Sequence, residues 1–142
     1  MENNYIVDLN YFNYIVYFAS ITLIIISEIH DKYLLFAGIL GQLILNYGIY
    51  KKANHIIELA HIVFILFIIF GSFYFKNIYN ILFLIILLSL LFITRYIYGN
   101  KCLFHLNSEN YRYEFIEKYF DFDWINILKM IFIYLIYRLW NH

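Results

Sequence analysis

Two pairs of side chains that could bind a metal ion stand out in this 142-residue sequence. Glu58 and His61 are three residues apart in an apolar stretch, and Cys102 and His105 follow with Cys-x-x-His spacing. Residues three apart share one face of a helix, so the first pair should point the same way. Zinc accepts thiolate, imidazole and carboxylate ligands in a tetrahedron. If the pairs converge, these four residues predict a zinc site, although one cysteine and one nearby histidine are half of a zinc motif.

A second interpretation of this region is structural, and it is the one we favour. Ionisable groups within apolar helices usually face neighbouring helices and find a partner there. An ion pair between Glu58 and Arg95 would join two helices, and His61 and Asn46 would add hydrogen bonds of about 0.6 kcal/mol each. All four residues fall within about two turns of one predicted membrane boundary. At the opposite boundary we expect only the polar residues Glu28, His30 and Asp31, so the polar chemistry should be one-sided.

The composition identifies the elements that would position these residues. Hydrophobic residues make up 64% of the chain, aromatic residues 23% and charged residues only 14%, whereas about 25% of a soluble domain is charged. Ten basic residues balance ten acidic ones, which argues against a nucleic-acid partner. A single cysteine excludes a disulfide framework within the chain. The sequence therefore predicts an integral membrane protein whose main partner is the lipid bilayer.

Four stretches are long and apolar enough to cross about 30 Å of hydrocarbon. A fifth contains Lys129 and Arg138, but their charges could reach the headgroups while Trp124 and Trp140 lie at the two interfaces. We predict a fifth span there, and a helix lying on the membrane surface is the alternative. The predicted spans are residues 11–27, 33–50, 56–75, 78–98 and 124–140.

Short polar connections between these spans require antiparallel neighbours. The fold class is therefore an all-α transmembrane bundle of four to five membrane helices, forming a single domain over residues 1–142. A short amphipathic helix is expected on the membrane surface within residues 99–123, where Glu114 and Lys118 form a favourable pair on its polar side. Within the second span, we expect Gly38 and Gly41 to allow close helix contact.

The basic residues near the spans predict the orientation of the chain. The end of the bundle that holds the N-terminus carries more of them, so the positive-inside bias places the N-terminus in the cytosol. With five spans, the C-terminus would lie on the opposite side. The cytosolic set is Lys51, Lys52, Arg95, Lys101, Arg112 and Lys118, and the opposite set is Lys32, Lys76 and Arg138.

Residues 56–140 carry short motifs in a recognisable order. They are His61, Phe64, Phe67 and Gly71, then Cys102-Leu103-Phe104-His105, then Glu109-Asn110, then Phe115-Ile116-Glu117-Lys118-Tyr119. This order resembles a family of small bacterial integral-membrane proteins of unknown function, in which a Cys-Pro-Leu-Thr motif precedes Glu-Asn and Phe-Ile-Glu-His-Tyr. The chain lacks the Pro and Thr of that motif. The resemblance implies a closing membrane helix at residues 124–140 and family positions at His61, Cys102, Glu109 and Glu117. It implies an architecture and no particular reaction.

We expect a structural or accessory protein that packs with other membrane proteins, in a homo-oligomer or a larger membrane complex. One alternative is a membrane-embedded metal-binding protein or enzyme with its site at the cytosolic face; no cofactor is expected apart from this zinc. A second alternative is a small transporter or channel. That function would need a polar path from Gln42 and Asn46 to Glu28 or His30.

Overall fold

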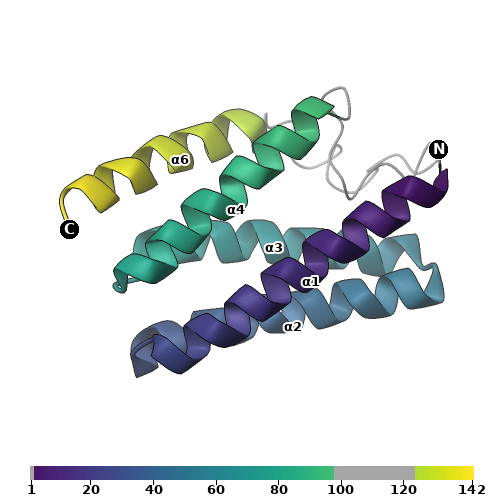
Figure 1. Ribbon diagram of the computed structural model, residues 1–142, viewed down its shortest axis with the longest axis horizontal. Coiled ribbons are helices and arrows are strands. Elements are labelled where there is room, and N and C mark those ends of the chain that lie inside the picture. The colour runs from purple at the N-terminus through teal and green to yellow at the C-terminus, as the bar shows by residue number, and fades with distance from the viewer. Residues whose placement is uncertain (1, 98–123) are drawn as a thin grey trace.

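The computed structural model describes residues 2–97 and 124–142, which form five helices and, within those ranges, no strand. Successive helices run in opposite directions along the long axis of the molecule (Figure 1). The predicted all-α bundle is confirmed. The amphipathic helix predicted within residues 99–123 lies outside the described residues. The helices are α1 (Glu2–Ile26), α2 (Ile29–Lys51), α3 (Asn54–Tyr74), α4 (Ile78–Ile97) and α6 (Trp124–Trp140).

Three of these helices are long and apolar enough to cross a membrane: α2, α4 and α3 from His55 onward. Only 28% to 33% of the residues in their most apolar windows are buried inside the bundle, so most of their apolar surface faces outward. Such a surface suits hydrocarbon and not water. The apolar part of α1, Asn10–Ile26, is shorter, and α6 has 17 residues. Both predicted outer spans are helical, and whether they cross the membrane stays a prediction.

The interface between α2 and α3 is built on small residues of α2. A Cβ atom added at Gly41 would lie 2.8 Å from Cγ1 of Val63, and one added at Gly38 would lie 2.9 Å from the ring of Phe67. Real Cβ atoms do not approach other atoms so closely. The expected close helix contact at both glycines is therefore confirmed.

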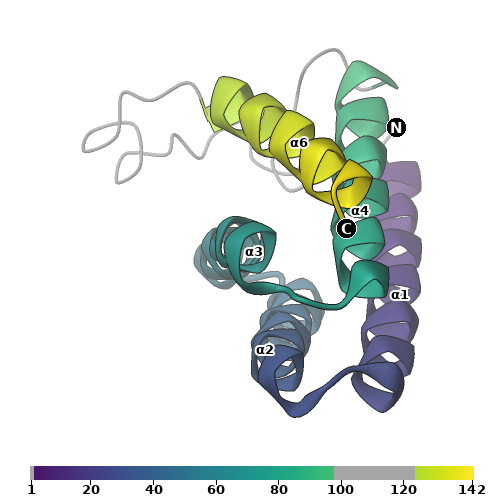
Figure 2. The same cartoon turned by 90° about the vertical axis from the view of Figure 1, so that its left-hand side faces the viewer.

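The remaining helices complete the bundle around an apolar core. Viewed at 90° to Figure 1, α2 and α3 lie on one side, α1 and α4 on the other, and α6 packs along α4 and α3 (Figure 2). Ile68 of α3, Leu84 and Leu88 of α4 and Leu135 of α6 are completely buried. The rings of Phe92 and Phe132 pack edge to face with centroids 5.7 Å apart and join α4 to α6.

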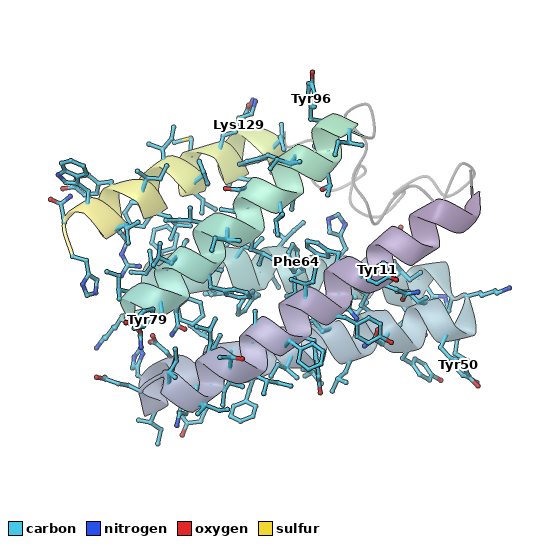
Figure 3. All side chains as sticks on the ribbon, viewed as in Figure 1. Tyr11, Tyr50, Phe64, Tyr79, Tyr96 and Lys129 are labelled. Atoms are coloured by element: carbon cyan, nitrogen blue, oxygen red, sulfur yellow. The ribbon has the colours of Figure 1, made fainter. Side chains whose placement is uncertain are left out.

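The labelled side chains in Figure 3 show how aromatic residues are distributed. Phe64 lies inside the bundle, and its ring packs edge to face on Phe12 of α1 with centroids 6.3 Å apart. Tyr79 lies at one end of the bundle and Tyr50 and Tyr96 at the other, all three exposed. Tyrosines at both ends are typical of a membrane protein, because the hydroxyl favours the headgroup region and the ring favours the hydrocarbon.

Candidate functional site

The four residues of the predicted polar cluster lie toward the same end of the bundle, the end at which α2 leads into α3. Asn46 of α2 accepts a hydrogen bond from the Nδ2 of Asn13 on α1. Glu58 and His61 lie half-buried on α3, and Arg95 lies half-buried in the last turn of α4. Within the described parts of the chain Glu58 and Arg95 form no ion pair. The expected link between α3 and α4 is therefore not made by these two charges.

The predicted zinc site is described only in part. Glu58 and His61 both belong to α3, whereas Cys102 and His105 lie outside the described residues. Among residues 2–97 and 124–142, no three His, Cys, Asp or Glu side chains gather closely enough to hold a metal ion. The four-residue site stays a prediction.

Among the described residues, the densest polar network lies at the other end of the bundle, around Asp31 in the first turn of α2. This carboxylate is 1% exposed and receives hydrogen bonds from three donors. The backbone N–H of Asn77 donates to Oδ2 at 2.9 Å, and that of Lys76 donates to both oxygens at 3.2 Å. The Nδ2 of Asn80 donates to Oδ2 at 2.8 Å. Asp31 therefore binds the turn between α3 and α4 and the start of α4.

Asn80 extends this network to the end of α1. Its side chain is completely buried in the first turn of α4. The hydroxyl of Ser27 donates to Oδ1 of Asn80 at 3.1 Å and accepts from Nδ2 at 2.9 Å. One amide thus connects α4 with the end of α1 and the start of α2.

Arg138 of α6 reaches the same turn from the other side. Its guanidinium donates to the backbone carbonyl of Ser72 and, at 2.6 Å, to that of Phe75. His142 lies 3.0 Å from the carbonyl of Lys76. Carbonyls at the end of a helix have no partner within the helix, and a cation there also favours the negative end of the helix dipole. Arg138 therefore caps α3.

We call Ser27, Asp31, Asn80 and Arg138, together with the turn at residues 75–77, the polar junction. It joins all five described helices at one end of the bundle, where the α1–α2 turn, the α3–α4 turn and the C-terminus lie together in Figure 1. The carboxylate of Asp31 accepts hydrogen bonds from the N–H groups of the turn. The guanidinium of Arg138 donates to the carbonyls of Ser72 and Phe75. This arrangement stabilises the packing, because its polar atoms bind one another.

Further hydrogen bonds between α1 and α2 follow a regular spacing. The buried residues Asn13 and Ser20 of α1 and Ser27, which directly follows α1, are seven apart, with Val16 and Leu23 buried between them. Asn13 pairs with Asn46, and Ser20 accepts from the Nε2 of Gln42 at 3.4 Å. This seven-residue repeat is typical of helices packed as in a coiled coil.

The polar path that a transporter would need is interrupted in this interface. Gln42 and Asn46 pair with α1, and the buried apolar residues Leu23 and Leu35 lie along the helices between them and the polar junction. These leucines separate the two polar regions of the α1–α2 interface.

The expectation of one-sided polar chemistry is wrong. Asp31, which we expect at the membrane boundary, is the most connected polar side chain among the described residues. The order of elements contained a signal that could have found the junction. Ser27, Asp31, Asn80 and Arg138 all lie near helix ends, and the antiparallel topology brings those ends together.

No family model matches the sequence, and no curated protein or solved structure matches it. The family resemblance carried by the motifs from His61 to Tyr119 therefore stays an expectation.

Proposed function

We propose that the protein is a non-catalytic membrane protein whose α1 packs against another membrane protein. The observation that carries this proposal is the outward position of Tyr14, a residue 56% exposed on α1. Tyr11, Ile15 and Phe18 are exposed beside it at helical spacing, and with Tyr14 they form the outer face of α1.

The depth of Tyr14 makes its exposure informative. It lies 12 residues before Ile26, the last residue of α1, which corresponds to about 18 Å along the helix axis. If α1 crosses the membrane with Ile26 at one boundary, about 30 Å of hydrocarbon extends past Tyr14, so its ring lies within the hydrocarbon. With the span predicted at residues 11–27, Tyr14 lies about one turn inside the boundary. No group in the described residues bonds its hydroxyl. A partner protein could supply the missing hydrogen bond, and aromatic side chains are enriched in protein interfaces.

The polar junction supports the accessory character of this function. It holds the described helices in one arrangement from inside, so the outer face of α1 is presented by a fixed bundle. Such a bundle needs little reordering when it binds, which lowers the entropic cost of association.

The proposal is tested by placing a photo-reactive phenylalanine analogue at Phe18 on the outer face of α1. Ile86, an exposed residue of α4, provides the matched control. Irradiation in native membranes should give one defined protein adduct from position 18 and only lipid adducts from position 86. An adduct with a second copy would identify a homo-oligomer. A strictly monomeric mass in mild detergent, together with lipid adducts alone at position 18, would overturn the proposal.

The hydroxyl of Tyr14 is tested separately. Tyr14→Phe removes one oxygen and should weaken the adduct or the oligomer several-fold. Tyr79→Phe makes the same change at the end of the bundle and should have no effect, because Tyr79 can bond to water there. Equal behaviour of the two variants would show that the Tyr14 hydroxyl has no role in association.

We further propose that all five helices cross the membrane, with the N-terminus in the cytosol. The bonds from Arg138 to Ser72 and Phe75 support this topology, because they place the end of α6 level with the end of α3. In a Cys102→Ser background, single cysteines replacing Lys52, Lys76 and Asn141 would be labelled with an impermeant reagent. Positions 76 and 141 should react from one side and position 52 from the other. Labelling of 141 together with 52 would refute a fifth span.

A further inference from the structure

We propose that the interface of α1, α2 and α3 contains a binding site for one water molecule inside the bundle. The site is independent of the proposed function. It stands on three observations: a cavity, two buried amide side chains that line it, and an oxygen on each amide that has no hydrogen-bond partner among the described residues.

The cavity is large enough for one water. Its volume is about 20 Å³, and a single water needs roughly 10–15 Å³ measured in this way. The wall is mostly apolar, with Val16 of α1, Leu45 of α2 and Ala60 and Phe64 of α3 among its residues. An empty cavity of purely apolar lining would stay dry, so the polar part of the lining decides whether water enters.

The polar part consists of Asn13 and Gln42, which are 1% and 7% exposed. Their amide nitrogens already have partners, Asn46 for Asn13 and Ser20 for Gln42. Oδ1 of Asn13 and Oε1 of Gln42 are buried and have no hydrogen-bond partner in the described residues. A buried amide oxygen without a partner is unfavourable, because it loses its bonds to water and gains none.

Water fits the chemistry of these two groups. Two acceptor oxygens require a donor, and a water molecule has two O–H groups to offer. Turning either amide over would present its NH2 group to the cavity, and water could accept from that group as well. Two neutral oxygens are also fewer than the six to eight oxygens that surround a cation such as Ca²⁺. A single water therefore serves the site in either amide orientation.

The direct test is magnetisation transfer from water to side-chain NH2 protons, measured by NMR on the protein in nanodiscs of deuterated lipid. The NH2 resonances of Asn13 and Gln42 should receive magnetisation with the sign of a dipolar contact, which separates bound water from proton exchange. Asn80 is the dry control, because it is completely buried and its NH2 donates two hydrogen bonds, to Ser27 and Asp31, whereas the NH2 groups of Asn13 and Gln42 donate one each. The exposed Asn141 is the wet control. Transfer to Asn141 with none to Asn13 and Gln42 would overturn the proposal.

A substitution that fills the cavity tests the location of the water. Ala60 is 2% exposed and lines the cavity, so Ala60→Val should reduce the transfer to Asn13 and Gln42 at least fivefold and lower the melting temperature. Ala37→Val makes the same change on an exposed position of α2 and should alter neither. Full transfer in a folded Ala60→Val protein would overturn the site. If that variant does not fold, the measurement on the unchanged chain decides.

Discussion

Replacing Asp31 with alanine should destabilise the bundle more than any other single polar substitution. The change removes the acceptor of three donors: the buried amide of Asn80 and the partly buried backbone N–H groups of Lys76 and Asn77. Each buried donor left without a partner costs about 1–3 kcal/mol. The lower end of that range applies to groups near a membrane boundary, where small movements admit water. We therefore expect the free energy of unfolding to fall by about 3–5 kcal/mol, as when one partner of a buried ionic network is removed.

The measurement is reversible unfolding by SDS in mixed micelles, followed by tryptophan fluorescence. Asp31→Asn keeps the shape of the side chain and one oxygen but loses the charge. It should therefore lower the free energy of unfolding by less than Asp31→Ala does, about 1–2 kcal/mol. Glu28→Ala is the matched control, because Glu28 is an exposed carboxylate three residues away and its side chain does not cap α2. The reasoning is refuted if the free energy of unfolding of Asp31→Ala lies within about 0.5 kcal/mol of the parent protein's, because substitutions on the surface have effects of that size.

Three further substitutions can be measured by the same titration. Arg138→Gln should lower the free energy of unfolding by about 1.5–3 kcal/mol, because the carbonyls of Ser72 and Phe75 lose a charged donor. Lys129→Gln, at an exposed position of the same helix, is the control. Equal effects of the two substitutions would contradict the capping role of Arg138. Lys52→Gly should stabilise the protein by about 0.5–1 kcal/mol, because Lys52 has φ 52°, a left-handed conformation that glycine adopts without strain. Gly48→Ala should destabilise it by about 1–3 kcal/mol, because its Cβ would lie 3.1 Å from the backbone nitrogen of Ile57; an unchanged stability would show that α2 and α3 can separate freely.

The helices could be predicted from hydropathy because their apolar stretches are long and separated by short polar turns. The stretch predicted at 78–98 is observed as Ile78–Ile97, and the one at 124–140 is observed as Trp124–Trp140. The first helix begins at Glu2 and not near residue 11, because its opening residues are helical although polar residues such as Asn3, Asn4 and Asp8 interrupt the apolar ones. Hydropathy identifies the residues that avoid water, and it does not predict where polar residues continue a helix.

The polar contacts could not be predicted in the same way, because they depend on the rotation of each helix about its axis. The predicted pairing of Glu58 with Arg95 rests on their similar depth in the membrane, and depth does not say whether two side chains face each other. Asn46 shows the consequence, since its partner is Asn13 of α1 and not a residue of α3 or α4. The seven-residue spacing of Asn13, Ser20 and Ser27 did contain this information, because it marks the side of α1 that packs inward.

The position of the polar junction follows from the turn between α3 and α4. That turn contains no glycine or proline, and in it Phe75 is buried, Asn77 is half-buried and Lys76 is exposed. The N–H groups of Lys76 and Asn77 then need an acceptor, and the carbonyls of Ser72 and Phe75 need a donor. Asp31 precedes this turn by 45 residues and Arg138 follows Ser72 by 66, so neither contact is local in the chain. Two opposite charges thus share one turn without touching each other, and each is compensated by the backbone between them.

The contact with Asp31 can form as soon as α2, α3 and α4 are together, whereas the contact with Arg138 requires α6. The two halves of the junction therefore depend on different helices, and the turn between α3 and α4 is the element that they share.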